Sequence, residues 1–423
     1  MLRKITGSLF LGLAAAAAAE LTVTADRPNA RYKPGERAVF KVVCKSEEPV
    51  TLAGIFSQDG GKVIRRFEFD PKQQSEFSET LKEPGFLRLT VTEKGKNLSA
   101  GKKRPAVFGV AFDPEQIRPG APEPADFWDF WQGEIAAAEK IPLDPRIEKL
   151  PAYCTEKWTC YSVSFAAPGG RVYGTLTLPK VSHKVPALVI VPGAGPGSAV
   201  PVRGLFNNRI AVLNMTVHDF GDEIFAGGNK KIAEYYKKLQ AKGVYSKSNA
   251  HDRKAYFFHR VILGINRAVD YLAGRPEIDP ARIGIQGSSQ GGMLALVVGT
   301  INPHVSVVAA NVPAMCDHHA GRQNRAPGWP RLVSSQVKGS DACAHYYDTV
   351  NFCRHLNKPV RVAVGFADGT CSPGTVYAAW NSIPAADKKI ADEIGMGHSV
   401  GPGFKAAQKW QFEMLSKNDK EKK

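Results

Sequence analysis

The first part of the chain alternates hydrophobic and polar residues with a period of two. Short apolar or alternating runs, separated by turn residues, recur from Leu21 to Phe112. Such alternation predicts strands with one face against a core. The runs are Leu21–Ala25, Ala38–Val43, Leu87–Thr92 and the hairpin arms Val50–Phe56 and Val63–Phe69, joined through Gln58–Gly61. Short strands at this spacing over about 90 residues predict an immunoglobulin-like β-sandwich, which we assign to residues 20–113.

A proline-rich linker, Pro119–Pro124, separates this region from a different pattern. Phe127, Phe130, Trp131 and Ile135 follow at helical steps of three and four residues. An aromatic stripe of this kind can be a stacking platform for sugars or the packing face of a helix, and the packing face is the more common of the two.

From Arg171 onward, apolar runs alternate with helical stretches, which predicts an α/β domain with a largely parallel sheet. We assign residues 114–423 to this domain. Its expected strands are Val172–Leu178, Ala187–Val191, Ala211–Val217, Arg282–Gln286, Val305–Ala309 and Val360–Val364, and a long helix is expected over Arg253–Leu272. In such sheets the reacting groups gather at the carboxyl ends of the strands.

Ser289 lies in Gly287-Ser288-Ser289-Gln290-Gly291, directly after an expected strand and before an apolar helical stretch. This is the G-x-S-x-G nucleophile elbow of α/β-hydrolases in its strand-turn-helix setting. The glycines permit a sharp turn that lifts the hydroxyl clear of the sheet. The alternative is an ordinary glycine-rich loop between a strand and a helix.

A reactive serine needs a base and an acid, and in α/β-hydrolases these follow in the order Ser, Asp or Glu, His. Asp368 comes just after the run Val360–Ala367, and His398 lies in a glycine-containing loop after an expected last strand. We therefore predict a Ser289, Asp368 and His398 triad. The alternatives, in less suitable places, are Asp348 or Asp392 as the acid and His318 or His319 as the base.

An oxyanion needs two backbone N–H donors. One is expected from Gln290, directly after the nucleophile, and the other from Ala194 in the glycine-rich segment Pro192–Gly195, which follows an apolar strand. No metal or organic cofactor is expected. In Asp317-His318-His319 the neighbouring histidines point apart on most backbones, and the sequence offers no obvious third ligand.

The N-terminus predicts export. Met1–Ala19 has basic residues, a short apolar stretch and a small-residue cleavage site, as in a secretory signal peptide, and the alternative is a retained N-terminal anchor. The apolar stretch is too short for a membrane span. We expect a periplasmic or extracellular protein. Disulfides are then possible, with Cys154 and Cys160 as the nearest pair, and the total of seven cysteines leaves at least one thiol unpaired.

The net charge of +16 does not indicate nucleic-acid binding, because the basic residues are spread along the chain among acidic ones. Only Lys417–Lys423 is a concentrated basic run. The charge is better explained by solubility and by attraction to acidic surfaces or glycans.

From Pro124 to Phe412 the chain resembles the acetyl xylan esterases and cephalosporin C deacetylases, a family of carbohydrate esterases with the α/β-hydrolase fold. The motifs that carry the resemblance are Pro124–Trp131, Arg267–Val269, Pro276–Asp279, the Gly-x-Ser-Gln-Gly elbow, Val312–Asp317, Tyr346–Asn351, Gly365–Pro373 and Thr375–Asn381. The resemblance implies deacetylation of O-acetylated oligo- or polysaccharides, with Ser289, Asp368 and His398 at the triad positions. It also implies a homo-oligomer, since members often form closed hexamers. The added sandwich domain argues against that same closed assembly here.

The chain departs from the family pattern at three places. His218-Asp219-Phe220 replaces an Arg-Gly-Gln motif, His398-Ser399 replaces a His-Glu pair, and Ala194 replaces a tyrosine of the oxyanion loop. The smaller Ala194 predicts a wider acyl pocket with weaker preference for acetate. Two other classes remain: a prolyl-oligopeptidase-like serine peptidase and a non-catalytic glycan-binding protein.

Overall fold

The computed structural model describes residues 20–46, 48–95, 105–198, 200–205, 209–221, 224–333 and 337–417. The expected leader 1–19 and the basic tail beyond residue 417 lie outside these ranges. Among the helices of the described ranges, none is both long and apolar enough to cross a membrane.

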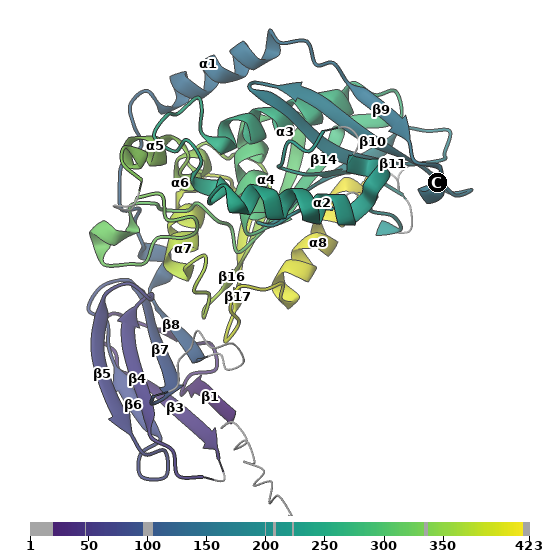
Figure 1. The fold of residues 1–423 in the computed structure, drawn as a ribbon. Coiled ribbons are helices and arrows are strands. Elements are labelled where there is room, and N and C mark those ends of the chain that lie inside the picture. Colours follow the sequence, from purple (N-terminus) through teal and green to yellow (C-terminus); the bar gives the residue numbers. More distant parts are fainter. Residues whose placement is uncertain are drawn as a thin grey trace, which may run out of the picture.

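The N-terminal part of the chain forms two β-sheets, drawn in purple and blue in Figure 1. Their strands are β1 Glu20–Ala25, β2 Arg31–Tyr32, β3 Ala38–Lys45, β4 Leu52–Gln58, β5 Val63–Phe69, β6 Glu76–Glu79, β7 Gly85–Glu93 and β8 Ala106–Phe112. One sheet has the order β1-β3-β6 and the other β2-β8-β7-β4-β5. The Phe40 ring of β3 meets the Phe56 ring of β4 at 5.3 Å, so the inner faces share a core. Each run predicted from the period-two pattern is a strand.

The rest of the chain builds one large mixed sheet. Its strands are β9 Arg146–Lys149, β10 Trp158–Ala167, β11 Gly170–Pro179, β12 Val185–Val191, β13 Ala211–Met215, β14 Ile278–Ser288, β15 Val305–Asn311, β16 Val360–Gly365 and β17 Lys388–Glu393. The order is β17-β16-β15-β14-β12-β13-β11-β10-β9. All neighbours from β13 to β17 are parallel, and β11, β10 and β9 join antiparallel. This is the expected α/β class with an α/β-hydrolase-like, mostly parallel sheet.

Helices cover both faces of the large sheet (Figure 1). They are α1 Phe127–Glu139, α2 Ile224–Ala241, α3 Phe257–Ala273, α4 Gln290–Ile301, α5 Ser340–Tyr346, α6 Thr349–Cys353, α7 Pro373–Ser382 and α8 Pro402–Leu415. A Cβ built at Gly284 in β14 would meet Leu415 of α8. Since the next residue, Ile285, approaches Gly299 of α4, and successive side chains point to opposite faces, α4 and α8 lie on opposite sides.

Two helix predictions can be compared with the structure. Helix α3 begins at Phe257 rather than at Arg253, because the Asp252 carboxylate accepts the N–H groups of Lys254 (2.8 Å) and Ala255 (3.2 Å) and forms a turn there. In α1 the aromatic stripe is a packing face, with Trp131 fully buried and its indole N–H donated to the Tyr346 carbonyl.

The N-terminal sheets pack against the end of the large sheet where β16 and β17 finish (Figure 1). A Cβ on Gly109 of β8 would lie 2.0 Å from the Phe366 carbonyl oxygen. Arg31 of β2 donates to Asp392 of β17 at 2.6 Å and to the Tyr377 hydroxyl at 2.7 Å. The two parts therefore meet beside the loops that follow β16 and β17, which carry Asp368 and His398.

All seven cysteines are free thiols in the structure. Cys154 and Cys160, the pair nearest in sequence, meet through a hydrogen bond from the Cys160 N–H to the Cys154 sulfur at 3.3 Å. A disulfide between them is therefore not present in this structure.

Candidate active site

Ser289 joins β14 to α4 in a strained backbone conformation, with φ 60° and ψ −120°. A positive φ is unusual for a residue with a side chain and persists only where the surroundings hold it. The Ser289 N–H donates to the Asn311 carbonyl at 2.9 Å, and its carbonyl accepts the N–H of Met293 and of Ala314, each at 3.0 Å. These bonds fix the turn that presents the hydroxyl.

The two elbow glycines are required by close backbone contacts. A Cβ on Gly291 would lie 2.2 Å from the Val191 carbonyl oxygen at the end of β12. A Cβ on Gly287 would lie 2.5 Å from backbone atoms of Gly291. The turn can therefore form only with both side chains absent.

The structure brings Ser289, His398 and Asp368 together, as the sequence predicts. His398 Nδ1 lies 2.7 Å from Asp368 Oδ2, and His398 Nε2 lies 2.9 Å from Ser289 Oγ. Asp368 is fully buried, and its second oxygen accepts the N–H groups of Thr370 (2.7 Å) and Cys371 (3.0 Å). When Nδ1–H donates to the carboxylate, Nε2 is free to accept the serine proton.

The alternative acids are committed to other parts of the fold. Asp348 accepts the N–H groups of Asp317, His318 and Val350. Asp392 pairs with Arg31 and accepts the Tyr377 hydroxyl.

The alternative bases also lie elsewhere. Burial lowers the pKa of His318 to about 3. His319 Nε2 pairs with Asp341 at 3.0 Å. The Ser289 hydroxyl pairs with His398 instead.

The loop after β12 is tied to the elbow by the Gln290 side chain, a role that the sequence did not predict. Gln290 is fully buried, and its amide nitrogen donates to the carbonyls of Pro192 and Gly193, each at 3.3 Å. Its amide oxygen accepts the Tyr245 hydroxyl at 2.8 Å. The glutamine within the elbow was the available signal, but nothing nearby in sequence indicated Tyr245.

His218 holds the same loop. Its Nε2 lies 2.8 Å from the Gly195 carbonyl, so that nitrogen carries the proton and donates. Burial lowers the pKa of His218 to about 4, which keeps the ring neutral. The ring also packs edge-on against Tyr245 at 4.9 Å. His218 thus supports the predicted oxyanion loop through the Gly195 carbonyl.

The two expected oxyanion donors lie on this framework. Gln290 is the first residue of α4, where a backbone N–H has no acceptor within the helix. Ala194 lies in the loop that the Gln290 and His218 side chains hold, and its own side chain is exposed. The loop is therefore open to solvent at this position.

One cluster in the described chain has ligand atoms close enough for a metal ion. Single ligand atoms of His319, Asp341 and His345 lie within 4.8 Å of one another. The sequence had offered no obvious third ligand beside His318 and His319, and the fold supplies Asp341 and His345 from α5. The imidazoles of His319 and His345 are stacked at 4.0 Å. Ser289, Asp368 and His398 are not part of this cluster.

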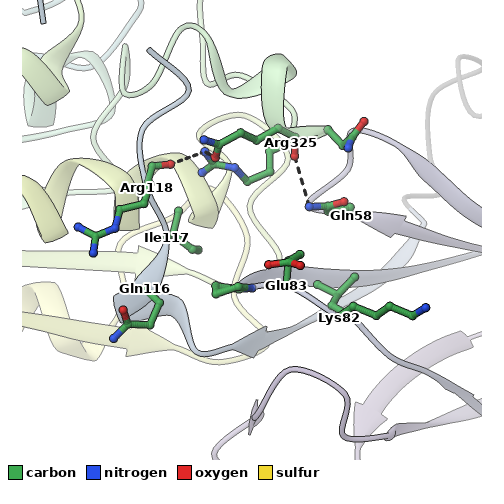
Figure 2. Close-up of a pocket in the computed structure, with 11 residues that line it drawn as sticks. Gln58, Lys82, Glu83, Gln116, Ile117, Arg118 and Arg325 are labelled. Carbon is green, nitrogen blue, oxygen red and sulfur yellow. Dashed lines mark hydrogen bonds between the residues drawn. The ribbon is translucent and has the colours of Figure 1, made fainter. Parts of the chain in front are cut away.

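A cleft of about 620 Å³ lies between the N-terminal sheets and the large-sheet region (Figure 2). Its walls are formed by Gln58, Leu81, Lys82, Glu83, Pro84, Gln116, Ile117, Arg118, Gln323, Asn324 and Arg325. Figure 2 shows Arg325 bonded to the Arg118 carbonyl, at 2.7 Å. None of the three predicted triad residues lines this cleft.

Comparison with known proteins identifies the family. The acetyl xylan esterase (AXE1) family model matches residues 113–324 and 340–415. The acetyl esterase Axe7A of Xylanibacter ruminicola is 32% identical over 322 residues, covering 74% of this chain and 71% of that protein.

Solved structures agree in fold. An acetyl xylan esterase from Paenibacillus sp. R4 has a TM-score of 0.59 at 21% identity, covering 71% of this chain and 98% of its own. Acetyl xylan esterase 1 from Thermoanaerobacterium sp. JW/SL YS485 has a TM-score of 0.57 at 20% identity, covering 71% and 97%. The sequence matches place the chain in the acetyl xylan esterase family, and the protein is a hydrolase of that family.

Proposed function

We propose that the protein removes O-acetyl groups from acetylated oligo- or polysaccharides, using Ser289, His398 and Asp368 as a catalytic triad. The observation that carries the proposal is the continuous hydrogen-bonded path from Asp368 through His398 to Ser289, at 2.7 Å and 2.9 Å. Family membership supports an acetylated carbohydrate as substrate, and the name of the Xylanibacter relative, an acetyl esterase, supports acetate as the acyl group.

The reaction proceeds in two halves. His398 Nε2 takes the Ser289 proton as Oγ attacks the acetyl carbonyl carbon, and the carbonyl electrons move to oxygen. Asp368 stabilises the imidazolium. The imidazolium then protonates the departing sugar oxygen, the ester C–O bond breaks, and acetyl-Ser289 remains. Water, deprotonated by His398, then attacks this ester. The bond from the acyl carbon to Ser289 Oγ breaks as the imidazolium returns the proton to Oγ, which releases acetate and restores the hydroxyl.

The N–H groups of Gln290 and Ala194 receive the negative oxygen in both halves. The side-chain bonds from Gln290 and His218 to the loop carbonyls hold these donors in place before the substrate arrives. Preorganised donors of this kind are worth about 3 kcal/mol each in the transition state. Neither a metal ion nor an organic cofactor takes part in the proposed reaction.

Replacement of the nucleophile tests the proposal. Ser289→Ala removes Oγ from a folded protein and should lower turnover of an aryl acetate by roughly 10⁶-fold. The matched control is Ser288→Ala, whose hydroxyl accepts the Asn311 amide at 2.8 Å and which should keep turnover within about tenfold of wild type. A fluorophosphonate probe should label the wild type and the control only. Turnover or labelling retained in Ser289→Ala would refute the triad.

Two substrate panels define the acyl and sugar groups. Acetate release from acetylated xylan, simple sugar acetates and O-acetylated sialic acid tests the glycan class. Acetate, butyrate and hexanoate esters test whether the exposed Ala194 leaves room for longer chains. One missing aromatic wall is worth roughly 1–3 kcal/mol of discrimination, so a steep fall beyond acetate would contradict the wider pocket.

The finer organisation is part of the proposal. Residues 20–113 form an immunoglobulin-like sandwich, residues 114–423 the catalytic domain, and residues 1–19 a leader cleaved on export to the periplasm or the extracellular space. N-terminal sequencing of secreted protein should begin at Glu20. Light scattering tests for a homo-oligomer. Nucleic acid is not a proposed partner.

Two other functions give different results in the same assays. A serine peptidase would cleave peptide substrates faster than acetylated sugars, and the N-terminal sheets are too small for the propeller that covers such sites. A non-catalytic glycan-binding protein would fail to react with the fluorophosphonate probe.

A further inference from the structure

Arg88 extends from strand β7 of the N-terminal sheets to the loop that carries Asp368. The side chain is almost entirely buried, with the residue 8% exposed. Its Nη2 donates a hydrogen bond to the main-chain carbonyl of Asp368. A residue far from the triad in sequence therefore contacts the backbone of its acid directly.

A second buried residue, Asp59, fixes both Arg88 and the far end of the same loop. Asp59 Oδ1 lies 3.8 Å from Arg88 Nη2, and Asp59 Oδ2 accepts the Gly374 N–H at 2.9 Å, at the start of α7. Asp59 is fully buried, and a Cβ on Gly374 would lie 2.5 Å from its Oδ2. The pair therefore spans the segment from Asp368 to Gly374.

Packing fixes the beginning of the loop. Gly109 of β8 lies so close to the Phe366 carbonyl that a Cβ there would be 2.0 Å away. The Phe86 ring of β7 packs edge-on against the Phe366 ring at 5.0 Å. The N-terminal sheets thus contact this loop at Phe366, Asp368 and Gly374.

These contacts come from outside the part of the chain that defines the family. The family match begins at residue 113, after Asp59, Arg88 and Gly109. The α/β part by itself therefore lacks the arginine that binds the acid's carbonyl.

We propose that the N-terminal sheets are part of the catalytic apparatus, with Arg88 as a positioning residue that fixes the backbone of Asp368 and, through it, the orientation of His398. This inference rests on the proposed function. The Asp368 carboxylate must stay aligned with His398 as the imidazolium forms. Displacement of a catalytic group by about 1 Å can lower the rate by about 100-fold.

The test compares two arginines that cross the same junction. Arg88→Met removes the bond to the acid's carbonyl and keeps an unbranched apolar stem. Arg31→Met is the matched control, because Arg31 bonds Asp392 and Tyr377 without reaching the Asp368 loop. Both variants of the full chain are assayed with an aryl acetate. The concentration of active sites is measured by complete labelling with the fluorophosphonate probe, and kcat is calculated per labelled site, so that unfolded protein does not lower its value.

For Arg88→Met we expect kcat per active site and the rate of probe labelling to fall by about 10- to 100-fold, with KM within about threefold of wild type. Arg88→Lys, which keeps a donor and the charge, should recover part of the loss. Arg31→Met should lower the melting temperature while its kcat stays within about twofold of wild type.

Two results would overturn the positioning role: an Arg88→Met enzyme with wild-type kcat per site, or an equal loss of kcat in Arg31→Met, which would mean general loosening of the junction. Failure of the proposed function is a separate result, because it would appear as turnover in Ser289→Ala. If Arg88→Met does not fold, Arg88→Lys is compared with Arg31→Met instead. A lower kcat per site in Arg88→Lys than in Arg31→Met supports the positioning role, and equal values overturn it.

Discussion

Gln290→Leu tests whether the elbow's own side chain holds the oxyanion loop in place. The substitution keeps the approximate volume of a fully buried side chain and removes its bonds to the carbonyls of Pro192 and Gly193 and to the Tyr245 hydroxyl. The backbone N–H of residue 290, the proposed donor, is untouched. Any loss of rate therefore comes from movement of the loop that carries Ala194.

The magnitude follows from the bonds that are lost. Each buried polar group left without a partner costs about 1–3 kcal/mol. The two hydrogen bonds to the carbonyls are long, at 3.3 Å, so each lost bond should cost about 1 kcal/mol, the lower limit of that range. With three bonds lost, the free energy of unfolding should fall by about 3 kcal/mol. Complete loss of one oxyanion donor costs about 3 kcal/mol, or about 100-fold in kcat, and a displaced Ala194 should cost between about 10- and 100-fold.

The assay is kcat for an aryl acetate per probe-titrated site, together with thermal unfolding. Tyr245→Phe is the matched control, since it removes one of the three bonds and leaves both loop carbonyls paired with the amide. Its kcat should fall by no more than about fivefold. A Gln290→Leu enzyme with kcat within threefold of wild type would refute the reasoning, because the loop would then hold its position without the amide.

Three further predictions concern the same framework. Gly291→Ala places a Cβ 2.2 Å from the Val191 carbonyl oxygen, and it should lower the free energy of unfolding by about 3 kcal/mol or more. The control is Gly321→Ala, whose Cβ would meet nothing within 4 Å and which should change the free energy of unfolding by no more than about 0.5 kcal/mol. Because burial lowers the pKa of His218 from 6.5 to about 4, the unfolded chain binds the proton first, and stability present above pH 6.5 is lost as the pH falls toward 4. The loss is on the order of 3 kcal/mol. His218→Gln should remove that part of the pH dependence in denaturant titrations, and parallel curves would contradict the assignment. A thiol reagent in denaturant should count all seven cysteines without prior reduction, and reductant should shift the melting temperature by no more than about 1 °C, whereas a lower count would reveal a disulfide.

The sequence could indicate that Ser289, Asp368 and His398 lie close together, because each of them follows a strand. Apolar runs identify β14 and β16, and since parallel strands end at one edge, Ser289 and Asp368 had to lie near each other. Period-two alternation likewise identifies β3 and β7. Strand β10 was not predicted. It lies before the region where strands alternate with helices, and much of its length is buried on both faces, so it lacks the period-two pattern of a half-buried strand.

The residues that support the site could not be found in this way. Arg88 reaches Asp368 only because two β-sheets pack against a loop from the other end of the chain. Tyr245 lies in a single turn of 3₁₀-helix with no periodic signal. The Gln290 side chain points back across the elbow to carbonyls that come from another strand. Such contacts depend on tertiary packing, which local patterns do not encode.

The left-handed backbone at Ser289, with φ 60°, has a consequence for how long such a site survives. A side chain in this conformation costs the folded state on the order of 1 kcal/mol or more, whereas glycine would adopt it without strain. Drift in a lineage with no use for the hydroxyl would therefore tend to replace the serine with glycine and gain stability. A serine at this position, close to two glycines fitted to the turn, is therefore present at a cost in stability that a use for the hydroxyl explains.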